Sequence, residues 1–174
     1  MNKKLLEKSM RELKTDINAL DGVYELTSRG VYLLAYSILK NPERAKDIMQ
    51  DTFLRVTANI DKYKPNTNAY AWILRIARNL SYRTYTNDLR SSSIEAIEEQ
   101  PSKETDSLWT ASIDLNKAMM NLTAQEREIV TLFSIEGYKH REIAQIVEKP
   151  MGTVQWMYNK AIKKLQEYLK EPTK

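Results

Sequence analysis

A helix predicted over residues 69–85 carries the side chains of greatest chemical interest in this sequence. Five groups that can contact phosphates or stack on bases recur along one of its faces: Arg75, Arg78, Asn79, Tyr82 and Arg83. A solvated helical face usually mixes charges of both signs, but this stretch contains no carboxylate. Guanidinium and aromatic groups together suit phosphate contact and stacking on unpaired bases. The face therefore predicts contact with a nucleic acid.

An apolar stripe on the opposite side of this helix would position the polar face. The stripe contains Trp72, Ile73, Ile76, Ala77 and Leu80. It is offset from the polar face by two positions, or about 200° around a helix, so we expect it to lie in the core. The preceding loop, residues 61–68, places a tyrosine between two lysines: Lys62, Tyr63 and Lys64.

The helix predicted to begin at Asn41-Pro42 has a charged face that allows two interpretations. Asn is a common N-cap, and Pro is favoured at the first helical position. The expected core side contains Ala45, Ile48, Met49, Phe53 and Val56, and the other side contains Asp47, Gln50, Asp51, Leu54 and Arg55. A face exposed to solvent is one interpretation, and it is sufficient to explain the charged residues. Leu54 beside a cluster of carboxylates favours a protein-docking face instead.

Residues 142–165 predict a helix-turn-helix, a motif that places its second helix in the major groove of DNA. A short helix containing Ala144 is followed by a turn at Pro150 and by a longer helix from Gly152-Thr153. The small side chain of Ala144 allows the two helices to cross closely. The slim first turn at Gly152-Thr153 leaves N–H groups accessible to a phosphate.

Composition excludes several classes of protein. The 174 residues include no cysteine and a single histidine, His140, so we expect no disulfide scaffold, no metal site and no cofactor. No phosphate-cradling glycine loop and no Ser/His/Asp arrangement is visible, so an enzyme has little support. No apolar run approaches the roughly 20 residues of a membrane span, and the charged first residues lack the apolar core expected of a signal peptide. We expect a cytoplasmic protein without membrane insertion.

Charge and periodicity divide the chain into two modules. The N-terminal half and the C-terminal third are net basic, whereas the segment between them is acidic and lacks helical periodicity. Ordinary variation of surface charge is one explanation, and two nucleic-acid-facing modules with a connector are the other. We predict an all-α fold with two small helical domains and a flexible acidic linker: residues 1–86, linker 87–112 and residues 113–174. Residues 1–14 predict a weakly anchored helix, and Thr123 with Glu126 predicts a capping box in the second domain.

The chain resembles the extracytoplasmic-function (ECF) sigma factors of bacterial RNA polymerase in both modules. In the first module, the resemblance rests on NPERAKDIMQDTFLRV from residue 41 and AWILRIARN from residue 71. In the second, it rests on LTAQERE from residue 122, GY from 137, EIA from 142 and GTV from 152. Two independent motif sets in the same order make this resemblance specific.

The resemblance implies a role for each surface. The polymerase-binding residues would be Asp47, Gln50, Asp51, Leu54 and Arg55. The opened minus-ten strand would be held by Lys62, Tyr63, Lys64, Arg75, Arg78, Asn79, Tyr82 and Arg83, with a base flipped from the stack. The minus-thirty-five duplex would be read by His140, Arg141, Thr153, Gln155, Trp156, Asn159 and Lys160. The implied partners are core RNA polymerase, promoter DNA and an anti-sigma factor.

Three positions depart from the family pattern in the second module. Lys139 replaces the usual Ser or Thr cap, and Glu148 replaces a frequent turn glycine. The run Gln155-Trp156-Met157 replaces a polar and basic one, which should weaken the attraction to phosphates. Gln155 can still bond an adenine edge, while Trp156 either contacts a thymine methyl or packs on a partner protein. The alternative function is a helix-turn-helix regulator that never joins polymerase and uses its first module to dimerise.

Overall fold

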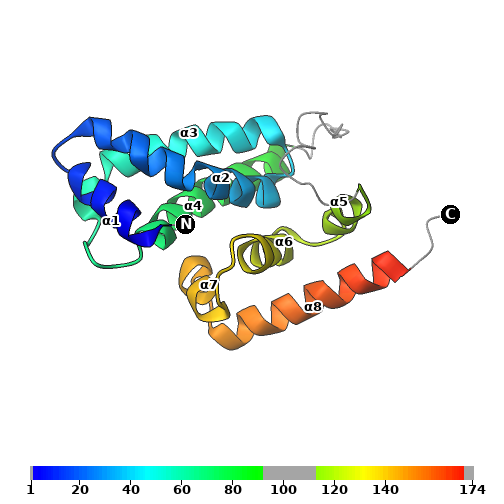
Figure 1. Ribbon diagram of the computed structural model, residues 1–174. Coiled ribbons are helices and arrows are strands. Elements are labelled where there is room, and N and C mark those ends of the chain that lie inside the picture. Colours follow the sequence, from blue (N-terminus) through cyan, green and yellow to red (C-terminus); the bar gives the residue numbers. More distant parts are fainter. Residues whose placement is uncertain (1, 92–112, 171–174) are drawn as a thin grey trace.

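The computed structural model describes residues 2–91 and 113–170, and these ranges contain helices and turns without a strand (Figure 1). The first module contains α1 (Lys3–Glu12), the 3-10 turn η1 (Ile17–Ala19), α2 (Leu20–Leu39), α3 (Pro42–Ala58), the 3-10 turn η2 (Ile60–Lys62) and α4 (Ala69–Ser91). The second contains α5 (Ile113–Met120), α6 (Ala124–Val130), the π-helical turn η4 (Thr131–Ile135), α7 (His140–Val147) and α8 (Met151–Lys170). The predicted all-α fold class with a C-terminal helix-turn-helix is confirmed.

Two helices begin where side-chain capping predicts that they should. Oδ1 of Asn41 accepts the N–H of Arg44 at 3.0 Å, at the start of α3. At the start of α6, the Thr123 N–H donates to Glu126 Oε2 at 2.9 Å, and the Glu126 N–H donates to Thr123 Oγ1 at 3.3 Å. Both arrangements satisfy N–H groups that have no partner within their own helix. The predicted capping box is therefore present.

The N-terminal helix is firmly held, so the expectation of a weakly anchored segment is wrong. Leu6, Met10 and Leu13 are buried, and α1 packs against α2 and α4. Their spacing of four and three residues places all three on one helical face. The many charges on the other face conceal this narrow apolar stripe in the sequence.

Helix α4 is longer than predicted. It continues to Ser91, past residue 87 where the linker was expected to begin. An ion pair between Arg44 of α3 and Asp88 holds this extension against the first module. The rest of the predicted linker, residues 92–112, lies outside the described residues.

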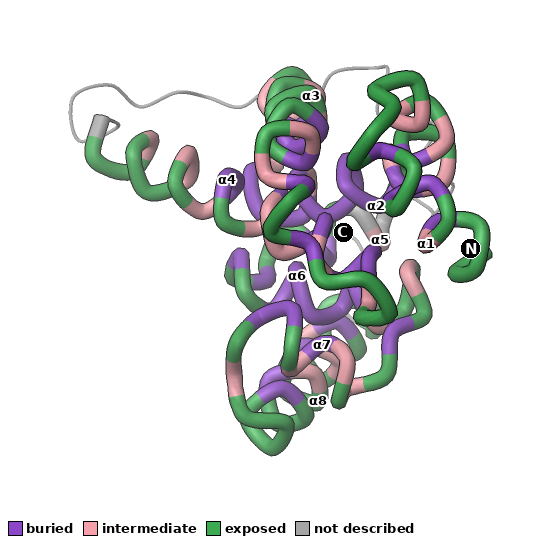
Figure 2. The backbone as a smooth tube through the Cα atoms, turned by 90° about the vertical axis from the view of Figure 1, so that its left-hand side faces the viewer, coloured by how far each residue is buried: buried purple, intermediate pink, exposed green. Residues whose placement is uncertain are grey.

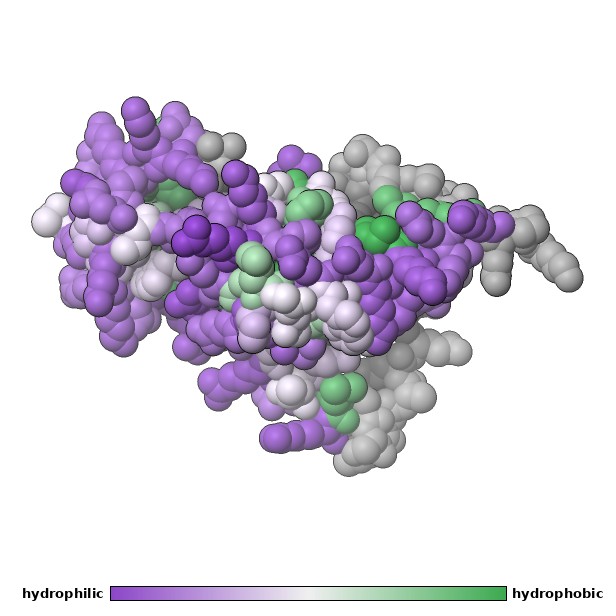
Figure 3. All heavy atoms as spheres, turned by 90° about the horizontal axis from the view of Figure 1, so that it is seen from below, coloured by the Kyte–Doolittle hydropathy of each residue, from purple (hydrophilic) through white to green (hydrophobic). Residues whose placement is uncertain are grey.

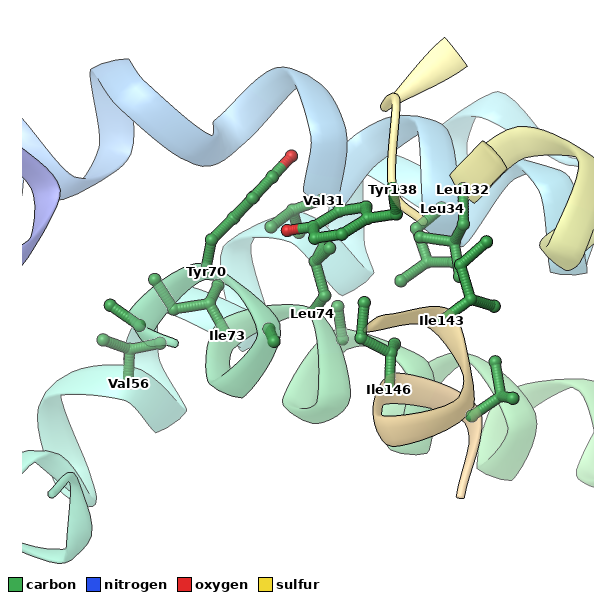
Figure 4. Packing of buried hydrophobic residues seen from close by; sticks show 14 of the residues in the cluster. Val31, Leu34, Val56, Tyr70, Ile73, Leu74, Leu132, Tyr138, Ile143 and Ile146 are labelled. Atoms are coloured by element: carbon green, nitrogen blue, oxygen red, sulfur yellow. The ribbon is translucent and has the colours of Figure 1, made fainter. Parts of the chain in front are cut away.

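The two modules pack directly against each other. One hydrophobic cluster joins Leu34 and Leu74 of the first module to Tyr138, Ile143 and Ile146 of the second (Figure 4). A second cluster joins α2 to α5, α6 and α8. The tube view shows buried segments of both modules meeting along this boundary (Figure 2). This contact was not predicted from the sequence, and it determines which parts of the candidate site are open.

Candidate nucleic-acid and polymerase interfaces

The polar face of α4 is partly covered by the second module. Arg78 Nε donates to Glu128 Oε1 at 2.6 Å, and the Tyr82 hydroxyl donates to Glu128 Oε2 at 2.7 Å. Only 14% of the Arg78 side chain and 1% of the Glu128 side chain are exposed. Arg75 Nη2 donates to the Gln145 carbonyl oxygen at 2.9 Å. Three of the five predicted nucleic-acid contacts on α4 are thus occupied by α6 and α7.

Burial dominates the electrostatics of this covered region. Burial raises the pKa of Glu128, while the Arg78 guanidinium and the Tyr82 hydroxyl act in the opposite direction. Burial, followed by the charge of Glu128, raises the pKa of Tyr82. Tyr82 therefore remains a neutral hydrogen-bond donor, and the Arg78 guanidinium lies over its ring at 4.8 Å from the centroid. These contacts form a compact polar cluster between the modules.

The other side of α4 opens into a pocket shared with α3. Its volume is about 400 Å³, and it is lined by Arg55, Asn59, Lys62, Trp72, Ile76, Asn79, Leu80 and Arg83. Lys62, Asn79 and Arg83 are predicted minus-ten residues, and Arg55 is a predicted polymerase contact. Six of the eight predicted minus-ten residues are thereby divided between this open pocket and the covered module boundary.

Sequence reasoning missed several residues of this pocket. Trp72 and Ile76 were assigned to the core, yet each is only partly buried and contributes to the pocket wall. Asn59 also lines the pocket, outside every predicted site. The sequence signal for Asn59 was its position at a helix break. It follows the end of α3 and directly precedes the turn η2.

The loop of residues 61–68 contains one correction. Lys62 and Lys64 are exposed as expected, but Tyr63 is only 1% exposed. Its hydroxyl donates to Glu7 Oε2 at 2.5 Å, and its ring lies 5.5 Å from that of Trp72. The Tyr63 ring is therefore a buried support of the loop and not an open platform for a base. Glu7, which lies 56 positions earlier, carried no signal in the sequence.

The predicted docking face of α3 points outward. All five of its residues are exposed: Asp47, Gln50, Asp51, Leu54 and Arg55. Leu54 is 67% exposed, although Phe53 and Val56 beside it are buried. An apolar side chain this open, among carboxylates, is consistent with a surface that another protein covers.

The helix-turn-helix is formed by α7, a turn and α8. Glu148 adopts the left-handed conformation (φ 55°, ψ 45°) that glycine usually supplies at a helix end. Six of the seven predicted minus-thirty-five residues are exposed: Arg141, Thr153, Gln155, Trp156, Asn159 and Lys160. Helix α8 lies on the side of the molecule seen in Figure 3, a mostly hydrophilic surface with small apolar areas.

His140 is placed differently from the other predicted minus-thirty-five residues. Its ring stacks on Phe133, with 4.5 Å between centroids, and meets the edge of Tyr158 at 5.1 Å. His140 is half-buried, because its ring packs in this aromatic cluster. Its contribution is to the packing of α7 on α8.

Comparison with known families identifies the class of protein. Residues 23–90 match the family Sigma-70 region 2, and residues 112–165 match the family Sigma-70, region 4. The fold and these two regions define a sigma factor, the subunit that directs RNA polymerase to promoters. Over 144 residues, the chain is 31% identical to the ECF RNA polymerase sigma factor EcfG of Rhodopseudomonas palustris (strain TIE-1). The aligned region covers 78% of this chain and 76% of EcfG. The chain belongs to the ECF RNA polymerase sigma factors.

Other relatives span nearly the whole chain. The ECF RNA polymerase sigma factor SigW of Bacillus subtilis (strain 168) is 24% identical over 96% of this chain and 98% of its own length. Among solved structures, the sigma factor RpoE in complex with the anti-sigma factor NepR from Bartonella quintana has a TM-score of 0.70 at 26% identity, covering 86% of this chain and 96% of that one. CnrH in complex with the cytosolic domain of CnrY has a TM-score of 0.72 at 19% identity, covering 98% of this chain and 99% of that one, which shows a shared fold.

Family membership decides between the expected functions. The chain is a sigma factor and not a regulator that acts without polymerase, and this family is not enzymatic. Within the described ranges, no group of three or more His, Asp or Glu side chains could hold a metal ion. None of the described helices is long and apolar enough to cross a membrane.

Proposed function

We propose that this sigma factor divides its work among three surfaces. The exposed α3 face from Asp47 to Arg55 docks on core RNA polymerase. The pocket between α3 and α4, which Lys62 lines, holds the opened minus-ten strand together with the exposed Lys64 of the loop. The exposed side of α8 reads the minus-thirty-five duplex. The first two surfaces belong to an N-terminal domain that ends with α4, and the third belongs to a C-terminal domain that begins with α5.

The pocket between α3 and α4 is the observation that carries this proposal. Its volume of about 400 Å³ lies in the usual range for small-molecule sites. Trp72 and Ile76 offer apolar surface on which an unstacked base can lie. Asn79 can donate to and accept from a base edge, and Arg83 with Lys62 can neutralise the flanking phosphates. A duplex reader has no need of such a pocket, because its target bases stay paired.

The covered side of α4 would contribute only after the modules move apart. Glu128 accepts hydrogen bonds from both Arg78 and Tyr82, and its negative charge repels a phosphate approaching them. Displacement of α6 and α7 would free these groups together with Arg75. The open pocket and the covered face would then form one continuous surface along α4 for the unpaired strand.

Two side chains on α8 are suited to base reading. Gln155 is exposed and can form two hydrogen bonds to an adenine edge. Trp156 is 61% exposed, and the Lys160 ammonium lies 4.9 Å from its ring centroid. That pair can contact a thymine methyl group and a neighbouring phosphate. Arg141, Thr153 and Asn159 add polar contacts to the backbone.

The fold relationship also supports a regulatory partner. RpoE from Bartonella quintana forms a complex with the anti-sigma factor NepR, and its structure covers most of this chain. We therefore propose that this protein also binds an anti-sigma factor, and that it acts in the cytoplasm with polymerase.

Holoenzyme reconstituted on a promoter tests the division between strand and duplex contacts. Asn79→Ala should reduce permanganate reactivity of the opened region while leaving binding to closed duplex unchanged. Gln155→Ala should weaken duplex binding by about 1–3 kcal/mol. Asn121→Ala, an exposed asparagine far from both surfaces in the chain, is the control. Normal opening by Asn79→Ala would remove the basis for placing the strand in the pocket.

A further inference from the structure

Helix α1 is bound to the loop of residues 61–68 by a set of polar contacts from one face. Glu7 accepts the Tyr63 hydroxyl at 2.5 Å through Oε2 and the Asn66 N–H at 2.8 Å through Oε1. Arg11 donates from Nη2 to Asn66 Oδ1, and its Nε lies 3.2 Å from Glu7 Oε1. Lys14 Nζ donates to the Tyr63 carbonyl oxygen at 3.2 Å. The loop is therefore fixed at its side chains and at its backbone.

These contacts hold a loop conformation that needs support. Asn66 has a φ of 63°, in the left-handed region that few residues other than glycine and asparagine adopt readily. Its N–H and its side-chain oxygen are both bound by α1. Glu7 and Arg11 are four residues apart, so they share the helical face that meets the loop. The adjacent face of α1, with Leu6 and Met10, is buried and anchors the helix.

The contacts between α1 and the loop extend through Tyr63 to the wall of the pocket. Tyr63 packs its ring against Trp72, with 5.5 Å between centroids, and Trp72 lines the pocket. Lys62, the residue immediately before Tyr63, lines the same pocket. A shift of Tyr63 would therefore move two pocket residues, an aromatic wall and a cation. Glu7 itself does not line the pocket and acts through Tyr63.

The protonation states suit this arrangement over the neutral range. Burial opposes the charge of Glu7, but the Asn66 N–H, the Tyr63 hydroxyl and Arg11 outweigh it and lower the pKa of Glu7 below its ordinary value. Burial and the hydrogen bond to Glu7 raise the pKa of Tyr63 to about 12. The carboxylate is thus a permanent acceptor and the phenol a permanent donor near neutral pH.

We infer that α1 is a positioning element for base selection: Glu7, through Tyr63 and Asn66, sets the shape of the pocket between α3 and α4 and so its preference among unpaired bases. This inference rests on the proposed role of the pocket. Glu7 and Arg11 are positioning residues, since neither lines the pocket. Their loss should leave a pocket that still binds single-stranded DNA and discriminates less among bases.

A randomised single-stranded DNA hexamer library, captured by holoenzyme and sequenced, provides the test. Glu7→Gln keeps the size of the side chain but removes the charge that accepts two donors and pairs with Arg11. We expect enrichment for the preferred base to fall by about three- to tenfold at one position of the hexamer, the worth of roughly one hydrogen bond. Total DNA capture and core polymerase binding should change by less than about twofold. Glu12→Gln, a glutamate on the exposed side of the same helix, should leave the whole profile unchanged.

A second variant removes the hydrogen bond between Tyr63 and Glu7 by changing the loop residue. Tyr63→Phe removes only the phenol oxygen and should flatten enrichment at the same position. The double variant should lose less than the sum of the two single ones, because both remove the hydrogen bond between Tyr63 and Glu7. If Glu7→Gln does not fold, Tyr63→Phe carries the same test. A selective effect at one position, with capture retained, is something that general destabilisation does not produce.

The outcomes separate this inference from the function on which it rests. If Asn79→Ala lowers capture while Glu7→Gln and Tyr63→Phe keep the wild-type base profile, the positioning role is wrong and the pocket assignment stands. If Asn79→Ala and Lys62→Ala both leave capture and base profile unchanged, the pocket is not the strand site and both proposals fail. Flattening at several positions at once, together with reduced capture, would also overturn the positioning role.

Discussion

Arg78 of α4 and Glu128 of α6 form a buried ion pair, with 2.6 Å between Nε and Oε1. The arginine belongs to the first module and the glutamate to the second, 50 positions later. This enclosed charge pair between the modules thus uses a residue whose type and spacing predict contact with DNA. Helix α4 consequently has one side closed by protein and one side open at the pocket.

Removing one partner of this ion pair should be costly, because the other would stay buried without a counter-charge. We expect Arg78→Ala to lower the free energy of unfolding by about 3 kcal/mol. Arg78→Met combined with Glu128→Leu should recover most of the loss, since apolar side chains need no counter-charge. Urea denaturation measures both effects. Arg83→Ala, an exposed arginine on the same helix, should change the free energy by less than about 0.5 kcal/mol, and equal losses at the two arginines would contradict the assignment.

The pH dependence of stability should contain a contribution from Glu126. Burial opposes its charge, but Lys164 Nζ at 2.8 Å and the Thr123 N–H at 2.9 Å outweigh burial and lower the pKa of Glu126 below 4.5. A lowered folded-state pKa contributes stability that is present above pH 4.5 and is lost as pH falls through the folded value. Glu126→Gln should therefore lower the free energy of unfolding at pH 7 by about 1–2 kcal/mol.

Urea unfolding of Glu126→Gln between neutral pH and the acid range provides the measurement. The variant should lose less stability than wild type as pH falls, because the titrating group is gone. Glu167→Gln, whose side chain is 66% exposed and lies 3.9 Å from Lys163, is the matched control and should follow the wild-type curve. Identical acid sensitivity in the Glu126 variant would show that this carboxylate contributes nothing.

Gly30 allows a second contact between the modules. The Tyr70 hydroxyl donates to Glu136 Oε2 at 2.6 Å, and a Cβ at position 30 would lie 1.6 Å from that hydroxyl oxygen. We expect Gly30→Ala to displace Tyr70 and to lower the free energy of unfolding by about 1–3 kcal/mol. Tyr70→Phe in the same chain should relieve part of the loss, because the overlapping oxygen is removed.

The matched control for this prediction lies on the same helix. A Cβ at Gly22 would meet only the flexible Ser9 side chain, at 3.0 Å from Oγ. Gly22→Ala also gains helix propensity of up to about 1 kcal/mol, so it should be neutral or mildly stabilising. Thermal and urea unfolding of both alanine variants make the comparison. Similar effects at the two glycines would mean that the close approach at Gly30 does not matter.

Local sequence predicted the helices well because local interactions determine them. Apolar spacing and the caps at Asn41 and Thr123 act within one or two turns, and the structure follows both. The core side of α4 was also correctly distinguished from its polar side, except at the pocket wall. No spacing rule, however, states which distant surface will cover a polar face. That information depends on how two complete modules fit together.

Two residues illustrate what the sequence could and could not reveal. Glu128 lies four residues after Ala124 and four before Leu132, both buried, so helical spacing places a carboxylate on a core face. Such a position signals a buried partner without identifying Arg78. Tyr63 gave no comparable signal, because its loop is polar and its partner Glu7 lies on a helix that charge patterning describes as solvated. Long-range hydrogen bonds of this kind require the three-dimensional structure.

The docking face of α3 leads to the last prediction. Leu54 is 67% exposed on this face, and it belongs to neither hydrophobic cluster. Leu54→Glu should therefore leave helical content and unfolding temperature unchanged while weakening binding to core polymerase by at least about 2 kcal/mol, the loss typical of a central apolar anchor. Leu89→Glu on α4 is the control, because Leu89 is 58% exposed and lies outside the proposed face. Circular dichroism and fluorescence titration with core polymerase measure the two properties separately. Retained affinity in Leu54→Glu, or an equal loss in Leu89→Glu, would move the polymerase contact away from this face.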